Sequence, residues 1–145
     1  MASTSQAQSR MKIPHAIVWL DHREALVCLM PSVESPFVQH HLHAPEAVGH
    51  PHRDGHARDE HSGRFFEDIA RSLEPVSEVL VVGPARAKNE FHAFTADRKP
   101  ELHARILGVE TLDHPTPGQL VAHARTFFKK TDAMRGTAPL NGHER

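Results

Sequence analysis

The strongest constraint on the fold is a set of short, nearly continuous apolar runs, each closed by a turn or a breaker residue. Residues 15–20 and 25–30 form two such runs separated by four polar residues, and residues 78–82 form another that ends at a Gly-Pro pair. The runs are short for helices and rich in β-forming residues, which is typical of buried strands. The sequence therefore predicts a sheet that is covered by helices.

The rest of the chain contains one edge strand, several helices and a last strand. Residues 37–43 alternate apolar and polar side chains, with His41 and His43 on the more polar face, which is typical of a half-exposed edge strand. Ser62 can cap the helix that follows, and Thr116 with Gln119 forms a capping box for the last helix. Apolar spacing and breakers predict helices at 62–73, 85–97 and from 116 onward, a short helical turn at 101–106 and a strand at 107–112.

This order of elements predicts an α/β, ribonuclease H-like fold. Three antiparallel strands lead into right-handed crossovers and give a five-stranded mixed sheet of order 3-2-1-4-5, in which strands 1, 4 and 5 are parallel. With 145 residues, we expect one such domain at 13–131. We expect a disordered segment at 1–12, a His-rich loop at 44–63 and a flexible tail at 132–145, because these segments lack a hydrophobic period.

Charge and cysteine content exclude several classes of protein. Lys and Arg number 17 against 18 Asp and Glu, so no bulk positive charge favours binding to nucleic acid. The single cysteine, Cys28, excludes an internal disulfide framework and suits a reducing compartment. The chain has no apolar run of about 18 residues and no secretory signal pattern. We therefore expect a cytoplasmic protein without a membrane partner.

Histidine is the most unusual part of the composition, with 14 His and no Tyr. The residues concentrated in and beside the expected loop include His43, His50, His52, His56 and His61. Neutral imidazoles at this density bind zinc, copper or nickel. No cysteine accompanies them, so the pattern favours a solvated, pH-responsive segment. Contact of these histidines with RNA or another anion is the hypothesis that follows for this segment. A specific site for zinc or another divalent metal is the alternative.

Polar residues also gather at the edge where the parallel strands end. They are Asp21, His22, Gly83, Asp113 and His114, with Arg86 and Lys88 at the start of the following helix. Open α/β sheets bind ligands at this edge, and a helix start with nearby cations suits an anion. The turn chemistry favours a structural alternative, in which the two Asp residues cap turns and the Gly permits a tight bend. Two-metal hydrolysis requires more converging carboxylates than Asp21 and Asp113 supply.

Three segments resemble a known family. They are AIVWLDHREA at 16–25, VLVVGPARAKNE at 79–90 and GVETLDHPTPGQLVA at 108–122. These segments are similar to small bacterial translational machinery proteins, which resemble the middle domain of archaeo-eukaryotic peptide-release factors. The resemblance spans roughly residues 13–131. It implies a ribonuclease H-like fold of the translation-component type, in agreement with the strand order predicted from the residues.

The resemblance also indicates what this chain lacks. In release factors, the loop after the third strand carries a Gly-Gly-Gln motif that promotes ester hydrolysis, and residues 44–63 contain no such motif. We therefore expect a non-catalytic factor that binds the ribosome or RNA and requires no cofactor. The alternative is a metal-binding or metal-dependent hydrolytic enzyme that uses Asp21, His22, Asp113 and His114. A homo-oligomer formed through the edge strand is compatible with both hypotheses.

Overall fold

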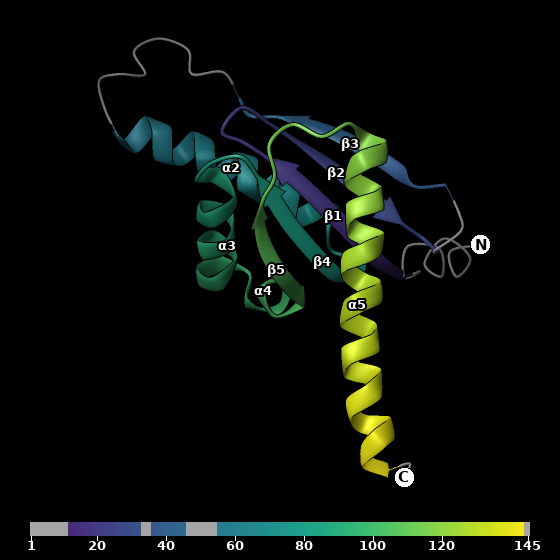
Figure 1. The fold of residues 1–145 in the computed structure, drawn as a ribbon. Coiled ribbons are helices and arrows are strands. Elements are labelled where there is room, and N and C mark those ends of the chain that lie inside the picture. Colours follow the sequence, from purple (N-terminus) through teal and green to yellow (C-terminus); the bar gives the residue numbers. More distant parts are fainter. Residues whose placement is uncertain (1–11, 33–35, 46–54, 144–145) are drawn as a thin grey trace, which may run out of the picture.

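The predicted sheet is confirmed by a computed structural model, which describes residues 12–32, 36–45 and 55–143, and the side chains of 12–32, 36–45 and 62–134. Its strands are β1 (Ile13–Leu20), β2 (Glu24–Met30), β3 (Val38–His43), β4 (Val76–Gly83) and β5 (Ile106–Thr111). Their order is β3-β2-β1-β4-β5 (Figure 1). β2 is antiparallel to β1 and β3, whereas β1, β4 and β5 are parallel, as the ribonuclease H-like prediction requires.

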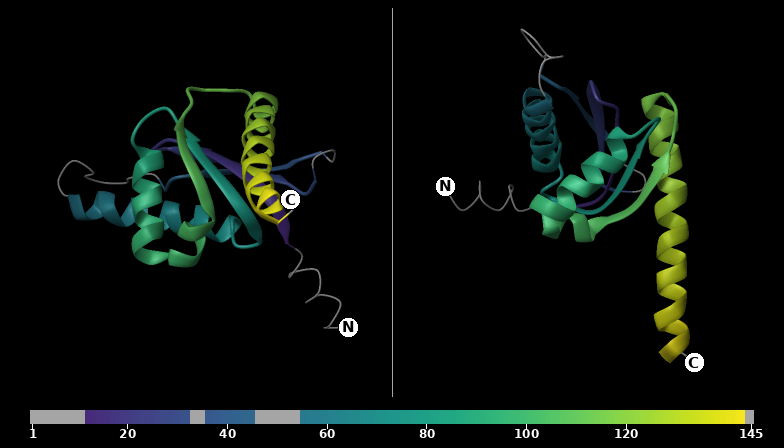
Figure 2. Two further views of the ribbon diagram at one scale, coloured as in Figure 1. Left: turned by 60° about the horizontal axis from the view of Figure 1, so that its bottom comes forward. Right: turned by 90° about the vertical axis from the view of Figure 1, so that its left-hand side faces the viewer.

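Helices cover both faces of the sheet. They are α2 (Gly55–Ser72), α3 (Ala87–Arg98), α4 (Pro100–Arg105) and α5 (Pro117–His143). The first three pack on one face and α5 packs on the other, so the sheet forms the middle layer (Figure 2). None of the helices in the described part of the chain is long and apolar enough to cross a membrane.

The alternation of side chains along the central strands produces two separate cores. On β1, Val18 faces the core that contains Phe65 of α2 and Phe91 of α3. Its neighbour Ile17 faces the opposite core, together with Leu120 at the start of α5. All five side chains are buried. Successive residues of a strand point to opposite faces, so the continuous apolar runs follow directly from a sheet covered on both sides.

Four strands end at the same edge of the sheet. β3 is antiparallel to β2, and β2 is antiparallel to β1, so β3 runs in the same direction as β1, β4 and β5. We call this end the carboxyl edge; it consists of residues 21–24, 43–45, 83–86 and 112–116. Both Asp-His dipeptides and the end of β3 lie there, as the topology predicts.

Two helix boundaries differ from the prediction. α2 begins at Gly55, so the expected loop at 44–63 is helical in its second part and Ser62 is not the helix start. Residues 55 to 61 begin with glycine, include histidine and aspartate of low helix propensity, and carry no apolar stripe. Neither propensity nor hydrophobic periodicity therefore reveals this part of the helix. α5 continues to His143, although a flexible tail is predicted from Asp132. Its apolar stripe ends near Phe128, and the extension carries no core-facing signal.

Candidate functional site at the carboxyl edge of the sheet

The turn between β1 and β2 places the first Asp-His dipeptide. Asp21 Oδ1 accepts hydrogen bonds from the backbone N–H groups of Arg23 at 2.8 Å and Glu24 at 2.9 Å. This carboxylate therefore caps the turn, as the structural alternative describes. The ring of His22 lies 2.8 Å from Glu90 Oε1, a residue in the first turn of α3. The contact joins the hairpin to α3 at the edge, with both side chains about half exposed.

A tryptophan on β1 positions the second dipeptide. Trp19 Nε1 donates a hydrogen bond of 2.6 Å to the backbone carbonyl of Asp113, and the indole is only 7% exposed. Its ring centroid lies 5.1 Å from that of His114. The Asp113 carboxylate is directed to solvent, with 90% of the side chain exposed, and one oxygen lies 3.0 Å from His114 Nδ1. Trp19 thus fixes the backbone that follows β5, while the Asp-His pair stays open to solvent.

The turn between β4 and α3 combines a structural glycine with an exposed cation. A Cβ at Gly83 would overlap the carbonyl oxygen of Leu20, so this close approach of β4 to β1 requires glycine. Arg86 precedes α3 and its side chain is exposed. Lys88 is 6% exposed, and its ammonium group donates to the carbonyl of Ala85. Of the two cations that the sequence singles out here, Arg86 can therefore meet a ligand from solvent.

Metal-binding donor groups come together at two places among the described residues. Glu24, His41 and His43 form one set, and a second contains His15, Glu78 and Asp132; within each set the potential ligand atoms lie within 4.8 Å of one another. Neither set includes Asp21 or Asp113, so the carboxylates of the two Asp-His dipeptides are not part of these sets.

The expected His-rich segment is only partly placed. His50 and His52 lie outside the described residues, and His56 and His61 lie in α2, where the side chains are not described. His43 ends β3 at the carboxyl edge, where the segment leaves the sheet. Of the five histidines that the sequence singles out here, only His43 can therefore be assigned contacts.

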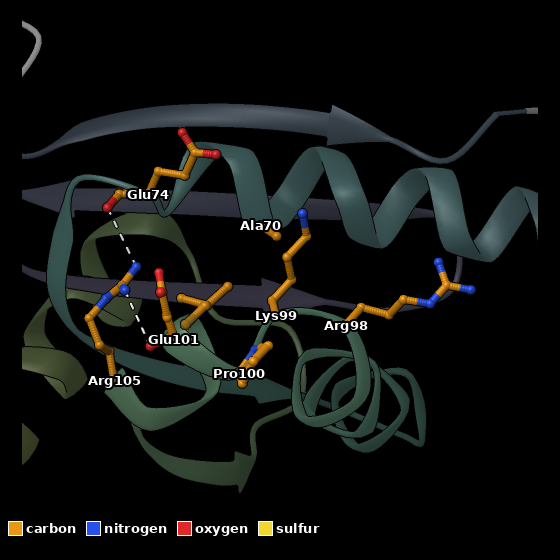
Figure 3. Close-up of a pocket in the computed structure, with 8 residues that line it drawn as sticks. Ala70, Glu74, Arg98, Lys99, Pro100, Glu101 and Arg105 are labelled. Atoms are coloured by element: carbon orange, nitrogen blue, oxygen red, sulfur yellow. Dashed lines mark hydrogen bonds between the residues drawn. The ribbon is translucent and has the colours of Figure 1, made fainter.

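A polar pocket of about 490 Å³ lies at the opposite edge, beside the ends of α2 and α3 and along α4 (Figure 3). Its cations already have partners. Arg105 donates to the carbonyls of Val76 at 2.8 Å and Leu73 at 3.3 Å, and Lys99 forms a 2.6 Å ion pair with Glu67. These contacts tie α4 to the chain before β4 and indicate a structural role for the pocket residues.

Sequence reasoning misses three residues that shape the carboxyl edge. Glu90 is the partner of His22, and Glu24 is the partner of His41 at 2.7 Å. Arg23 is an exposed cation in the same turn. The antiparallel register between β2 and β3 is the signal that could have identified Glu24, because the beginning of one strand must lie opposite the end of the other.

Comparison with known proteins finds solved structures with a similar fold. No family model matches the sequence, and no curated protein matches it. The structure is similar to the archaeal translation termination factor aRF1, with a TM-score of 0.59, 15% identity, and coverage of 98% of this chain and 45% of that chain. It is also similar to Pelota from Archaeoglobus fulgidus, with a TM-score of 0.53, 12% identity, and coverage of 97% and 42%. The chain spans less than half the length of either protein, and it has the fold of part of each of them.

Proposed function

We propose that this chain is a translation-associated factor that binds the ribosome or its RNA and does not catalyse peptide release. The supporting observation is the similarity of 98% of the chain to part of the archaeal translation termination factor aRF1, at a TM-score of 0.59. One fold can serve many functions, so the surface must also suit the proposed partner. The carboxyl edge supplies that chemistry.

The cations at the carboxyl edge suit phosphate groups. Arg23 and Arg86 are exposed on neighbouring turns, and neither forms an ion pair with any residue that the structure describes. A guanidinium group can bind phosphate through two parallel hydrogen bonds. His22 and His114 are exposed at the same edge; one ring nitrogen of each lies beside a carboxylate, on Glu90 and Asp113 respectively, and the other ring nitrogen can contact a phosphate. This arrangement supports a local RNA-binding surface on a chain whose net charge is only −1.

The sequence between β3 and the buried part of α2 argues against peptide release. Release factors carry a Gly-Gly-Gln motif in the loop after the third strand, and this chain has no Gly-Gly-Gln anywhere. The nearest fragment, Pro-Gly-Gln at 117–119, begins α5, and Gln119 is engaged in the capping box with Thr116. We therefore assign the chain a binding role.

Sedimentation through a sucrose gradient with ribosomes from the same host tests the proposal. The protein is prepared for this experiment without a polyhistidine tag, because its own 14 histidines already bind metal resins. We expect the wild type to sediment with ribosomal particles, and the double variant Arg23→Ala with Arg86→Ala to shift toward the top of the gradient. Each phosphate contact that is lost should reduce the slope of log affinity against log salt by about one.

Arg98→Ala is the matched control. Arg98 is an exposed arginine at the far end of α3 from Arg86, and its side chain is 68% exposed beside Asp97. We expect this variant to bind as the wild type does. A wild-type chain that stays at the top of the gradient at low salt would contradict the proposed function. Equal losses in the control and the double variant would contradict the choice of surface.

A further inference from the structure

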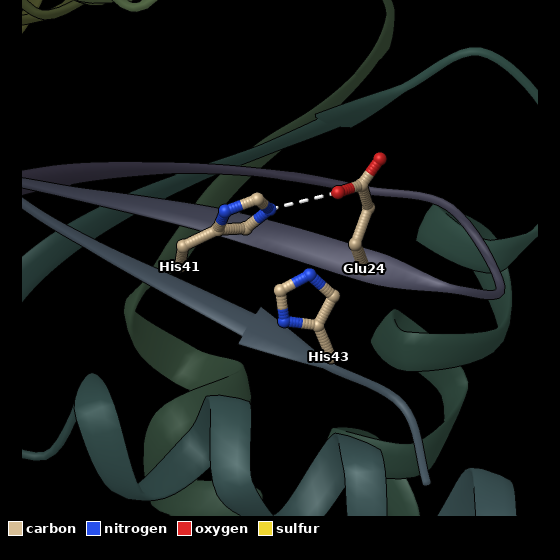
Figure 4. A group of neighbouring side chains, drawn as sticks. All are labelled: Glu24, His41 and His43. Atoms are coloured by element: carbon tan, nitrogen blue, oxygen red, sulfur yellow. Dashed lines mark hydrogen bonds and ion pairs between the residues drawn. The ribbon is translucent and has the colours of Figure 1, made fainter. Parts of the chain in front are cut away.

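The beginning of β2 and the end of β3 bring three metal-ligating side chains to one face of the sheet. Glu24 pairs with His43 across the two strands, and His41 lies two residues earlier on β3. Residues two apart on a strand point to the same face, so both imidazoles stand beside the Glu24 carboxylate. His41 Nε2 lies 2.7 Å from Glu24 Oε1, and the two imidazole centroids are 4.5 Å apart. The three side chains point toward one another (Figure 4).

The spacing of the donor atoms suits a transition metal. The potential ligand atoms of Glu24, His41 and His43 all lie within 4.8 Å of one another. A zinc ion with tetrahedral ligands at ~2.1 Å needs donors about 3.4 Å apart. Small rotations of exposed side chains can close that difference without a change in the backbone. Two imidazoles and one carboxylate are a set that zinc uses in sites with an open position.

The backbone around this set is fixed. β2 and β3 pair from Glu24 and His43 through Leu29 and Val38, so both histidines lie within a continuous ladder. The ladder extends one step beyond the site, because the N–H of Ala44 donates a 2.8 Å hydrogen bond to the carbonyl of Arg23. Sites on paired strands hold their ligands in a more constant geometry than sites on loops. The side chains remain reachable, with Glu24 39% and His41 53% exposed.

The second set of donors has a different character. His15 and Glu78 are separated by 3.3 Å and about four-fifths buried, and the His15 ring lies on Phe128 at 4.3 Å. Asp132 belongs to this set as well, and its side chain is exposed. His15 of β1 and Glu78 of β4 lie under α5, whereas Asp132 belongs to α5, so this set of one imidazole and two carboxylates indicates a contact that holds α5 on the sheet. The set on β2 and β3 has twice the number of imidazoles and faces solvent.

We propose that Glu24, His41 and His43 bind one divalent transition-metal ion, of which zinc is the best match to the donor set. The Glu24 carboxylate and one nitrogen of each imidazole are the protein ligands, and the remaining position faces solvent. The site lies at the carboxyl edge, where the His-rich segment begins. It does not depend on ribosome binding, and it can be tested on the isolated chain.

Isothermal titration of the untagged full chain with Zn²⁺ tests this site. Histidines of the following segment can also take up metal, so the titration uses a background in which four of them are replaced. The replacements are His50→Ala, His52→Ala, His56→Ala and His61→Ala. In this background we expect one Zn²⁺ per chain, and we expect Co²⁺ to give visible absorption bands typical of a site with imidazole ligands.

Three further variants distinguish Zn²⁺ binding at this site from nonspecific Zn²⁺ binding to other histidines. His41→Ala combined with His43→Ala should weaken Zn²⁺ binding by at least ~10-fold, since even the loss of an outer partner costs about 10- to 100-fold. Glu24→Gln should also weaken binding. His40→Ala is the matched control, because His40 is an exposed histidine of β3 that points to the opposite face. We expect it to leave binding unchanged.

The results of these titrations either support or contradict the proposed metal site. Loss of binding in the variants of the three ligands, with binding kept in His40→Ala, supports the site. Unchanged binding in the double variant, no Zn²⁺ binding in the four-histidine background, or an equal loss in His40→Ala would overturn it. The side chains of Glu24, His40, His41 and His43 are partly or fully exposed, so far-UV circular dichroism should show that the variants at these positions fold.

Discussion

The close approach of β1 and β4 at the carboxyl edge makes Gly83 sensitive to substitution. A Cβ at Gly83 would overlap the backbone carbonyl of Leu20, and a backbone atom cannot rotate away as a side chain can. Overpacking in a well-packed interior costs about 1–3 kcal/mol, and a clash of a new methyl group with a backbone carbonyl belongs in the upper half of that range. With a urea slope of ~2 kcal/mol/M, we expect Gly83→Ala to lower the unfolding midpoint by about 1 M.

The comparison that isolates this effect is Gly63→Ala. Gly63 lies within α2, and a Cβ there would meet nothing within 4 Å. Alanine is favoured over glycine in a helix interior by about 0.5–1 kcal/mol, so this variant should unfold at a higher urea concentration than the wild type. Both are measured by urea titration with far-UV circular dichroism. A Gly83→Ala midpoint equal to the wild type, or shifts of the same sign in both variants, would refute the argument.

Three other predictions follow from buried or paired groups. Trp19→Phe removes the donor to the Asp113 carbonyl and should destabilise the fold by about 1–3 kcal/mol; an unchanged urea midpoint by circular dichroism would count against this. Burial raises the pKa of Cys28 to about 11, so a thiol reagent at pH 8 should label it only in denaturant, and rapid labelling of the native chain would contradict this. Burial and the nearby His103 lower the pKa of His92, so the unfolded chain binds more protons and stability falls as the pH drops below 6.5. His92→Gln should reduce that loss between pH 7 and pH 5.5, and an identical loss in variant and wild type would refute it.

The parts of the fold that could be predicted are those with a strong hydrophobic or capping signal. The buried runs around Ile17 and Leu80 specify central strands, and the order of the sheet follows from short and crossover connections. The capping box is also confirmed, since Thr116 and Gln119 exchange hydrogen bonds of 2.9 and 3.1 Å. The polar first turns of α2 carry neither signal, and for that reason the helix start at Gly55 is missed.

The candidate site could be predicted in its location but not in its contacts. Topology alone brings the two Asp-His dipeptides to one edge, because both follow parallel strands. It does not show that Lys88 turns to the Ala85 carbonyl, which depends on a side-chain rotamer. Nor does it pair Glu24 with His43, which requires the register of β2 on β3.

The central claim is that the carboxyl edge faces RNA on the ribosome, and site-specific crosslinking tests it most directly. Asp113→Cys places a thiol at this edge, and Asp97→Cys places one at the far end of α3; the native side chains are 90% and 82% exposed. The native Cys28 is buried, so a thiol-reactive photocrosslinker should attach only at the new cysteine. On ribosomes, we expect crosslinks to ribosomal RNA from position 113 and none from position 97. Crosslinks from position 97 alone, or from neither position, would contradict the account.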